Sequence, residues 1–413
     1  MSTLSRLVAT AVTLGLATAT LAFAPAASAQ GHHHSNHADH RKHGSHHHGR
    51  HHHGHHHSAH PSAHLLTSGL VSPLRVAVAP DGTAYVSENF TGTIDRISPG
   101  GTRTHVYTDP HGYEVGGLSL AGSSVLFTVT QSAGQGENLD SWLKVLSPSG
   151  HVRTIADLHS YEAASNPDQH TTYGFAGADT SDPAVAACLA TWPADNGPAV
   201  YQGAVDSHPY ATSAAGKGGT YVADAGANAV FLVSPSGTVS TAATLPAIPY
   251  TITAEAAAGM GLDPCFVGKT YSFEPVPTDV EVGTDGTVYV TSLPGGPEGP
   301  QLGARGSVFA FSSHGGGSHP VHQVATGLLG ATGLAVGPKG TLYVAQMFGD
   351  MISKVSLGRH GATVTDAVST PTPGDVAWTS RGLYFTSNVL SGTPLDPHGN
   401  TTTPNGQLIR YGR

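Results

Sequence analysis

One unit recurs along most of the chain: an alternating apolar strand, a tight turn that carries glycine, and a second strand centred on Tyr or Val. The clearest copies are residues 76–89, 280–290 and 334–346. An Asp-Gly or Lys-Gly pair between two alternating runs supplies the positive-φ positions of a hairpin, so each unit contains an antiparallel pair. Weaker copies carry glycine at the same turn, and the hairpin glycines are Gly82, Gly122, Gly219, Gly286, Gly340 and Gly382.

A second signature, Ser-Pro followed by Gly-Gly or Ser-Gly, ends at residues 101, 150 and 237 and precedes a further β-rich run. Each unit therefore has four strands, and six such units predict an all-β fold, a six-bladed β-propeller. The last copy is one strand short, whereas a spare β-rich run at 64–68 precedes the first copy. We expect this N-terminal strand to close the last blade, which leaves no open sheet edge.

Two unusually long spacings locate insertions at about 160–206 and 251–274. We expect both to form a cap over one mouth of the propeller, with helices only at 183–191 and 254–258. Each insertion carries one of the two cysteines, Cys188 and Cys265. An oxidising compartment favours a disulfide between them, worth on the order of 4 kcal/mol in the loop-entropy treatment. Two separate buried thiols are the alternative.

The first 29 residues predict where in or outside the cell the protein is located. An apolar run at 7–24 ends at Ala27-Ser28-Ala29, which is typical of a cleaved signal peptide and predicts a secreted, extracellular protein. A single membrane anchor is the alternative, but the small-residue cleavage pattern and the lack of basic residues directly after the run favour cleavage. After cleavage we expect no membrane association.

Residues 30–63 form a second region, rich in His, Gly and Ser and almost free of large apolar side chains. Such a segment cannot bury a core, so we expect disorder. Closely spaced imidazoles are ligands for zinc, nickel or copper. A solvated linker without a metal role is the alternative. The candidate metal ligands are His46, His47, His48, His51, His52, His53, His55, His56 and His57.

Charge separates this arm from the rest of the protein. The whole chain has a formal charge of -9, with 18 basic and 27 acidic residues. Only four of the basic residues and one acidic residue lie in the first 64 positions, so the predicted propeller domain, residues 64–413, carries -12. An acidic body excludes a strongly basic nucleic-acid binder, whereas the arm gains positive charge on mild acidification. Binding to anionic cell-envelope polymers is a hypothesis that follows.

The repeats resemble NHL-type propeller repeats, most closely at residues 219–233. Residues 166–168, 207–210 and 275–283 look like the secreted actinobacterial ScyD/ScyE-like family, although His208 stands where that pattern has Asn. The resemblance covers about 65–413 and implies a propeller fold. It does not imply a reaction, because one fold hosts unrelated chemistries.

Polar residues begin the innermost strand of each unit, where a propeller directs them at its central channel. These axial candidates are Arg75, Glu114, His208, Tyr210, Asp279, Thr332 and Asp375. Three carboxylates with an imidazole and hydroxyls could hold calcium or act as acid and base, and similarity to gluconolactonase-type propellers, which use an axial metal, points the same way. The alternative is structural: Asp279 and Asp375 accept backbone N–H bonds, and Arg75 neutralises them.

No nucleophile elbow, phosphate-binding glycine loop, zinc-protease helix or dinucleotide fingerprint occurs in the sequence. We therefore expect a monomeric extracellular module that binds a small molecule, an envelope polymer or a protein. A metal-assisted hydrolase or lactonase, or an enzyme of small-metabolite chemistry that uses the axial channel, is the alternative.

Overall fold

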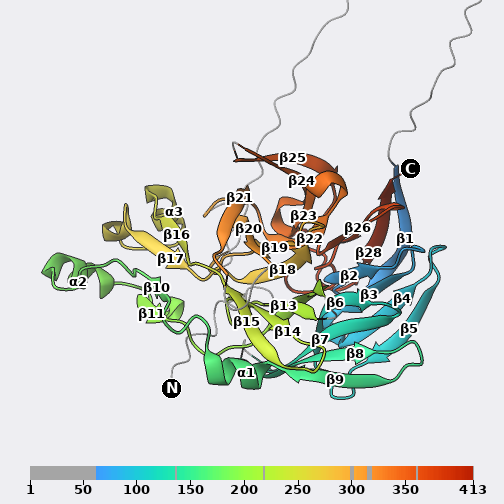
Figure 1. Ribbon diagram of the computed structural model, residues 1–413. Helices are drawn as coiled ribbons and strands as arrows, with labels where there is room; N and C mark the ends of the chain where they lie inside the picture. Colours follow the sequence, from blue (N-terminus) through green and yellow to red (C-terminus); the bar gives the residue numbers. More distant parts are fainter. Residues whose placement is uncertain are drawn as a thin grey trace, which may run out of the picture.

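The structure is a computed structural model that describes residues 62–134, 137–216, 219–297, 302–313, 319–359 and 361–412. The predicted signal peptide and the histidines of the arm up to residue 61 lie outside the described residues. The described chain forms seven four-stranded antiparallel sheets (Figure 1). No helix among the described residues is long and apolar enough to cross a membrane.

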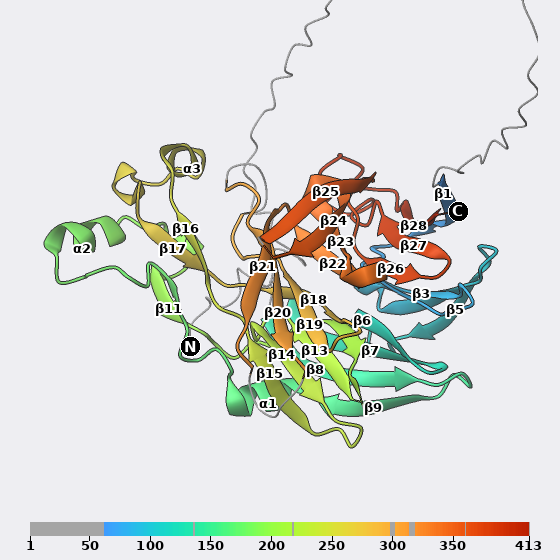
Figure 2. The ribbon, with the colours of Figure 1, turned by 45° about the horizontal axis from the view of Figure 1, so that its top comes forward.

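Six sheets stand side by side around a common axis, and each begins at the axis with its first strand (Figures 1 and 2). The first sheet contains β2 (Arg75–Val78), β3 (Ala84–Glu88), β4 (Thr93–Ile97) and β5 (Arg103–Thr108). The second contains β6 (Glu114–Ala121), β7 (Ser124–Gly134), β8 (Glu137–Leu146) and β9 (Val152–Asp157). The third contains β12 (Pro209–Ala214), β13 (Thr220–Asp224), β14 (Ala229–Val233) and β15 (Val239–Thr244).

The remaining sheets of the ring follow the same order. The fourth contains β18 (Pro277–Val282), β19 (Thr287–Ser292), β20 (Gly306–Ser312) and β21 (His322–Leu328). The fifth contains β22 (Ala331–Val336), β23 (Leu342–Gln346), β24 (Met351–Gly358) and β25 (Gly361–Ser369). The sixth contains β26 (Val376–Thr379), β27 (Gly382–Ser387), β28 (Gly406–Gly412) and β1 (Ser62–Leu70). We interpret these six sheets as the blades of the β-propeller.

The innermost strands β2, β6, β12, β18, β22 and β26 contact one another in this order, and β26 contacts β2, so the ring is closed. Apolar side chains fill the space between neighbouring blades; Ala77 of β2, for example, packs in one cluster with Val115 and Val129 of the next blade. Because each blade is covered on both faces, its central strands are buried on both faces, as all five residues of β13 illustrate. The predicted propeller fold is confirmed.

Ring closure by the N-terminal strand is also confirmed. Strand β1 pairs antiparallel with β28, with Ser62 opposite Gly412 and Leu65 opposite Ile409. Where β1 ends, the Glu88 carboxylate accepts a hydrogen bond from the Val71 backbone N–H, and Arg103 forms an ion pair with Glu88. The first blade therefore holds the strand that completes the last one.

The two insertions form the seventh sheet, in the order β11 (Val200–Gln202), β10 (Thr172–Gly174), β17 (Thr270–Phe273) and β16 (Ile248–Thr251). With α1 (Leu158–Ser165), α2 (Pro183–Leu189) and α3 (Ala254–Gly259), they make up what we call the insertion lobe. Two helices were expected, and α1 is additional. The lobe projects from the side of the propeller in Figures 1 and 2, so the expectation of a cap over the mouth is wrong.

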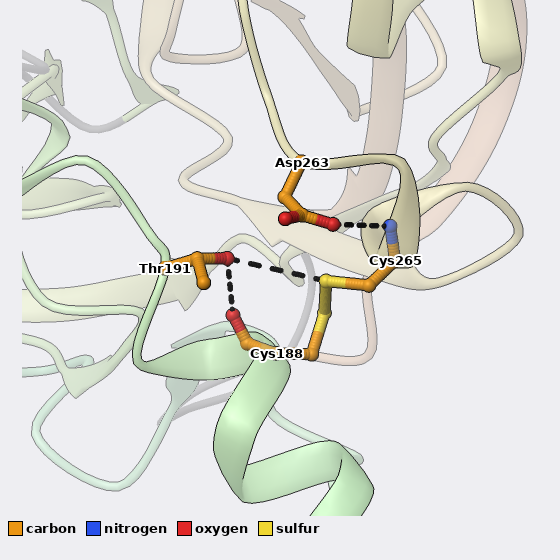
Figure 3. The surroundings of a disulfide bond; sticks show 4 residues. All are labelled: Cys188, Thr191, Asp263 and Cys265. Carbon is orange, nitrogen blue, oxygen red and sulfur yellow. Dashed lines mark hydrogen bonds between the residues drawn. A yellow bond between two sulfur atoms is a disulfide. The ribbon is translucent and has the colours of Figure 1, made fainter.

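The lobe lies sideways because it shares a core with the outer part of the third and fourth blades. Phe175, Phe266 and Tyr271 of the lobe belong to the same buried cluster as Tyr221 and Phe311 of those blades. The predicted disulfide joins Cys188 to Cys265 across the two insertions, with 5.9 Å between their Cα atoms (Figure 3). Beside it, Thr191 donates a hydrogen bond to the Cys188 carbonyl (2.8 Å), and Asp263 accepts one from the Cys265 amide (2.8 Å).

Candidate functional site: the polar cluster on the propeller axis

A sharp turn precedes the inner strand in three of the blades and positions the axial side chain that follows it. Ser72, Val276 and Thr372 have positive φ angles of 47°, 48° and 31°, and each is followed by proline. Backbone in this region is costly for such residues, above all for β-branched ones, and persists only where the surroundings enforce it. Each turn lies three residues before an axial charge, namely Arg75, Asp279 or Asp375. The turns therefore position these charges.

Arg75 occupies the centre of the cluster and is 1 % exposed. Its guanidinium donates hydrogen bonds to the carbonyls of Thr332 (2.9 Å) and Thr278. One nitrogen lies 3.4 Å from an Asp279 oxygen and 3.6 Å from an Asp375 oxygen. The guanidinium carbon lies 4.2 Å from the centre of the Tyr210 ring, a cation–π distance. One side chain thus connects four inner strands.

Both axial aspartates also join neighbouring blades. Asp279 accepts the N–H of Leu334 (2.6 Å), and Asp375 accepts that of Val76 (2.8 Å). Each also accepts the N–H of the residue after it, at 2.7 Å. Burial raises the pKa of both carboxyls, and the nearby Arg75 charge opposes the rise. Every carboxylate oxygen of the pair is therefore bound to backbone, which is the structural alternative stated above.

The buried His208 and the partly buried Glu114 form a second pair, with 3.1 Å between a carboxylate oxygen and Nε2. The other Glu114 oxygen faces the Asn89 amide at 3.4 Å, and the His208 backbone N–H donates to Asp224 (2.7 Å). Burial lowers the pKa of His208, but the charges of Glu114, Asp206 and Asp224 reverse the effect and raise it to about 9. His208 is therefore a cation at neutral pH, not a free base.

The two remaining candidates have different surroundings. Thr332 donates to the Pro373 carbonyl (3.4 Å), as Thr278 donates to that of Ala331 (2.7 Å), so these hydroxyls connect neighbouring inner strands. The position equivalent to Asp279 is Gly333, one residue further on, since it lies three residues after the positive-φ Gly330. The Tyr210 hydroxyl is buried and has no hydrogen-bond partner.

Apolar side chains lie directly beside this polar cluster. Tyr210 belongs to a buried cluster that also contains Leu74, Val276, Met347 and Val389, contributed by the turns around the axis. A surface hollow of about 390 Å³ lies away from the axis, against β20 and β21 around Phe311 and His322. No group of three or more His, Cys, Asp or Glu among the described residues is placed to hold a metal. Asp279 and Asp375 have no carboxylate oxygen left for a divalent cation, because backbone N–H groups and Arg75 already bind them.

Polar residues at the ends of the second strands, and in the loop after β13, accept hydrogen bonds from the segments that lead into the inner strands. Asp224 accepts from His208, Gln346 accepts from the Leu329 amide (2.6 Å), and Asn228 accepts from the Val276 amide (3.1 Å). What sequence reasoning missed is a further group of buried carboxyls at the base of the insertion lobe. They are acidic residues in a short helix and in loops, where such side chains are usually exposed to solvent, and only the tertiary structure buries them. They are Glu162, Asp168, Asp206 and Glu274.

The sequence matches no known protein family and no curated protein. Solved structures do resemble it. A luciferin-regenerating enzyme superposes with a TM-score of 0.52 at 12% identity, over 86% of this chain and 95% of that one. A gluconolactonase from Xanthomonas campestris gives 0.50 at 11% identity, over 85% and 89%. A soluble aldose sugar dehydrogenase from Escherichia coli gives 0.50 at 9%, over 85% and 99%. At these identities the likeness establishes the β-propeller fold alone.

Proposed function

We propose that this protein is a secreted β-propeller that acts as an extracellular binding module, and that its axis is structural. The observation that carries this proposal is the arrangement of the axial charges. Arg75, Asp279 and Asp375 bind one another and backbone groups of neighbouring strands. A catalytic acid, base or metal ligand needs an oxygen or nitrogen that is free to meet a substrate, and this pair of aspartates offers none.

The alternative is a metal-assisted hydrolase or lactonase, or an enzyme of small-metabolite chemistry. The enzyme names of the similar structures are compatible with it. Against it stand the ion pair of His208 with Glu114 and the apolar cluster around Tyr210. The finer assignment to the ScyD/ScyE-like family rests on the sequence resemblance alone and belongs to this proposal.

The histidine-rich arm supplies the binding chemistry in this proposal. Its imidazoles are ligands for zinc, nickel or copper, and they gain positive charge as the pH falls toward their ordinary pKa of about 6.5. The disulfide supports an oxidising, extracellular location. We infer that the arm holds metal at neutral pH and adheres to anionic envelope polymer under mild acid.

Deletion of residues 31–61 tests the arm. The deletion ends before Ser62, because β1 begins there. Elemental analysis after loading with zinc should find several ions per full chain and far fewer in the deletion variant. Co-sedimentation with isolated cell walls should increase from neutral to mildly acid pH for the full chain only. Equal zinc content, or pH-independent sedimentation of the full chain, contradicts the proposed role of the arm.

The axis is tested separately with Glu114→Gln. Assays of the full chain and the variant on a panel of lactones and aldoses distinguish the two functions. We expect no turnover by either protein. Turnover by the full chain that is lost in the folded variant would establish the enzyme alternative.

A further inference from the structure

Five carboxyl groups are buried together at the base of the insertion lobe, where it joins the third and fourth blades. Three of them have hydrogen-bond donors. Asp206 accepts from the Asn138 amide at 2.9 Å. Asp224 accepts from the Ser207 hydroxyl at 2.6 Å, and Glu274 lies 3.3 Å from the Asn228 amide nitrogen.

The other two are only partly satisfied or not satisfied at all. Asp168 is 1 % exposed; its Oδ2 accepts from the Tyr173 hydroxyl (2.9 Å) and from Asn228 (3.0 Å), but its Oδ1 has no partner. Glu162 is 0 % exposed, and neither of its oxygens has a hydrogen-bond partner of good geometry, although the Asp206 backbone N–H faces its carboxyl. The Asn166 side-chain oxygen is a further buried acceptor without a donor.

These unpartnered oxygens belong to one short segment, the end of α1 and the turn after it. Asn166 ends α1 with a φ of 33°, and its N–H binds the Glu162 carbonyl (2.7 Å). Its side-chain nitrogen donates to the Gly203 carbonyl (3.2 Å), which leaves the side-chain oxygen free. The Asp168 carboxylate lies against the same glycine, since a Cβ on Gly203 would be 2.1 Å from Oδ1. Gly203 is therefore the residue that leaves room for this carboxylate.

Buried acceptors without donors need either a proton or a cation. Burial, with the charges of Asp224 and Asp168, raises the pKa of Glu162 to about 9, while the nearby Asp206 amide opposes the rise only in part. The cation that acts on the neighbouring Asp206 is His208. Acidic groups therefore outnumber cationic groups around Glu162.

We propose that Glu162, Asn166 and Asp168 bind a hard divalent cation, Ca²⁺, through their unpartnered oxygens. Carboxylate and amide oxygens are the ligands that Ca²⁺ prefers, and solvent or backbone carbonyls complete its shell. The proposed ligands are two carboxylates and one amide. A set with only two carboxylates is compatible with the finding that no three His, Cys, Asp or Glu side chains among the described residues are grouped to hold a metal. With so few protein charges, the affinity falls in the range of extracellular calcium modules, about 10⁻⁴ to 10⁻³ M.

The site fastens the lobe to the propeller. Glu162 and Asp168 lie at the start of the first insertion, and their neighbours Asp206 and Glu274 lie where the two insertions return to the blades. A cation here joins these strands at the point where the lobe begins. The proposal is independent of the histidine arm, because imidazole is a poor ligand for Ca²⁺.

Terbium luminescence on the full chain tests the site. Tb³⁺ replaces Ca²⁺ at oxygen sites, and Tyr173, whose hydroxyl binds Asp168, is placed to sensitise its emission. We expect saturable emission under tyrosine excitation that Ca²⁺ displaces, and a melting temperature that rises with CaCl₂ but not with NaCl of equal ionic strength. Glu162→Gln and Asp168→Asn should each weaken binding by about tenfold or more.

The matched control is Glu255→Gln, an exposed carboxylate on α3 of the same lobe, which should bind as the unaltered chain does. If Glu162→Gln does not fold, Asp168→Asn and the calcium dependence of the unaltered chain decide the question. Absence of displaceable emission, a melting temperature unaffected by CaCl₂, or unchanged binding in a folded Glu162 or Asp168 variant overturns the proposal.

Discussion

Replacing Arg75 by methionine tests whether the axis is structural. The change removes the guanidinium and keeps most of the side-chain volume. Asp279 and Asp375, whose oxygens lie 3.4 and 3.6 Å from that guanidinium, then lose their counter-charge. The carbonyls of Thr278 and Thr332 lose their charged donor as well.

Breaking a buried ion pair by removing one partner typically costs about 3–5 kcal/mol. A domain is stable by only about 5–15 kcal/mol, so we expect a large fall in the free energy of unfolding. Arg75 is 1 % exposed, so solvent screening reduces this figure little. The measurement is guanidinium unfolding followed by tryptophan fluorescence, with the exposed Arg359→Met as the matched control.

The same variant has a pH signature. Without Arg75 the pKa values of Asp279 and Asp375 rise further in the folded state. A carboxyl with a raised folded pKa binds a proton in the native but not in the unfolded state, so the variant should lose stability as pH rises from mildly acid to neutral. Adding Asp279→Asn and Asp375→Asn should restore part of the loss. If Arg75→Met lowers the free energy of unfolding by less than about 1 kcal/mol, as a substitution at an exposed site does, the axis is not structural.

Three further predictions concern other parts of the fold. His208→Gln should flatten the pH dependence of stability between about 6.5 and 9, because the raised pKa of His208, about 9, gives stability that is present at low pH and lost as pH rises through it; urea unfolding across this range measures it. Replacing both Cys188 and Cys265 by serine should lower stability by about 4–5 kcal/mol in the loop-entropy treatment, since the bond spans 77 residues, with calorimetry as the measurement. Gly333→Ala should destabilise by about 1–3 kcal/mol, because its Cβ would lie 2.5 Å from backbone of the next inner strand, whereas Gly177→Ala, with open space around it, should not.

Each of these has a contrary result. An unchanged pH profile in the His208 variant would mean that its imidazole is neutral in the native state. Equal melting temperatures with and without the disulfide would show that the Cys188–Cys265 bond constrains the unfolded chain little. Equal effects of the two alanine substitutions would contradict the close approach of inner strands at Gly333.

The sequence predicted the axial charges because the repeat places them. Arg75, Asp279 and Asp375 each follow the same turn at the same spacing, and alignment of the copies places them at the start of inner strands. In the fifth copy the residue three positions after the positive-φ turn residue Gly330 is Gly333, so Thr332 lies one position before the place that Arg75, Asp279 and Asp375 occupy in their copies.

The carboxyls under the insertion lobe were not predictable in this way. Glu162 lies on α1, whose eight residues carry no clear apolar face, and Asp168 follows in a turn. Acidic residues in such segments are usually solvated. They are buried here because residues about 40 to 110 positions away return to the same place, among them Gly203 and Glu274.

The sequence by itself determined the repeat, the four-stranded unit and the closing N-terminal strand, since these depend on local turn chemistry and on periodicity that recurs along the chain. It favoured the disulfide, and the structure places the two cysteines together. Only the tertiary structure decided which polar atoms are satisfied. Closure of the ring brings the axial aspartates against backbone N–H groups and Arg75. The packing of the insertion lobe on the blades leaves the Glu162 oxygens without a hydrogen-bond donor of good geometry. Hydrogen-bond satisfaction depends on the positions of atoms from distant segments, and local pattern does not specify those positions.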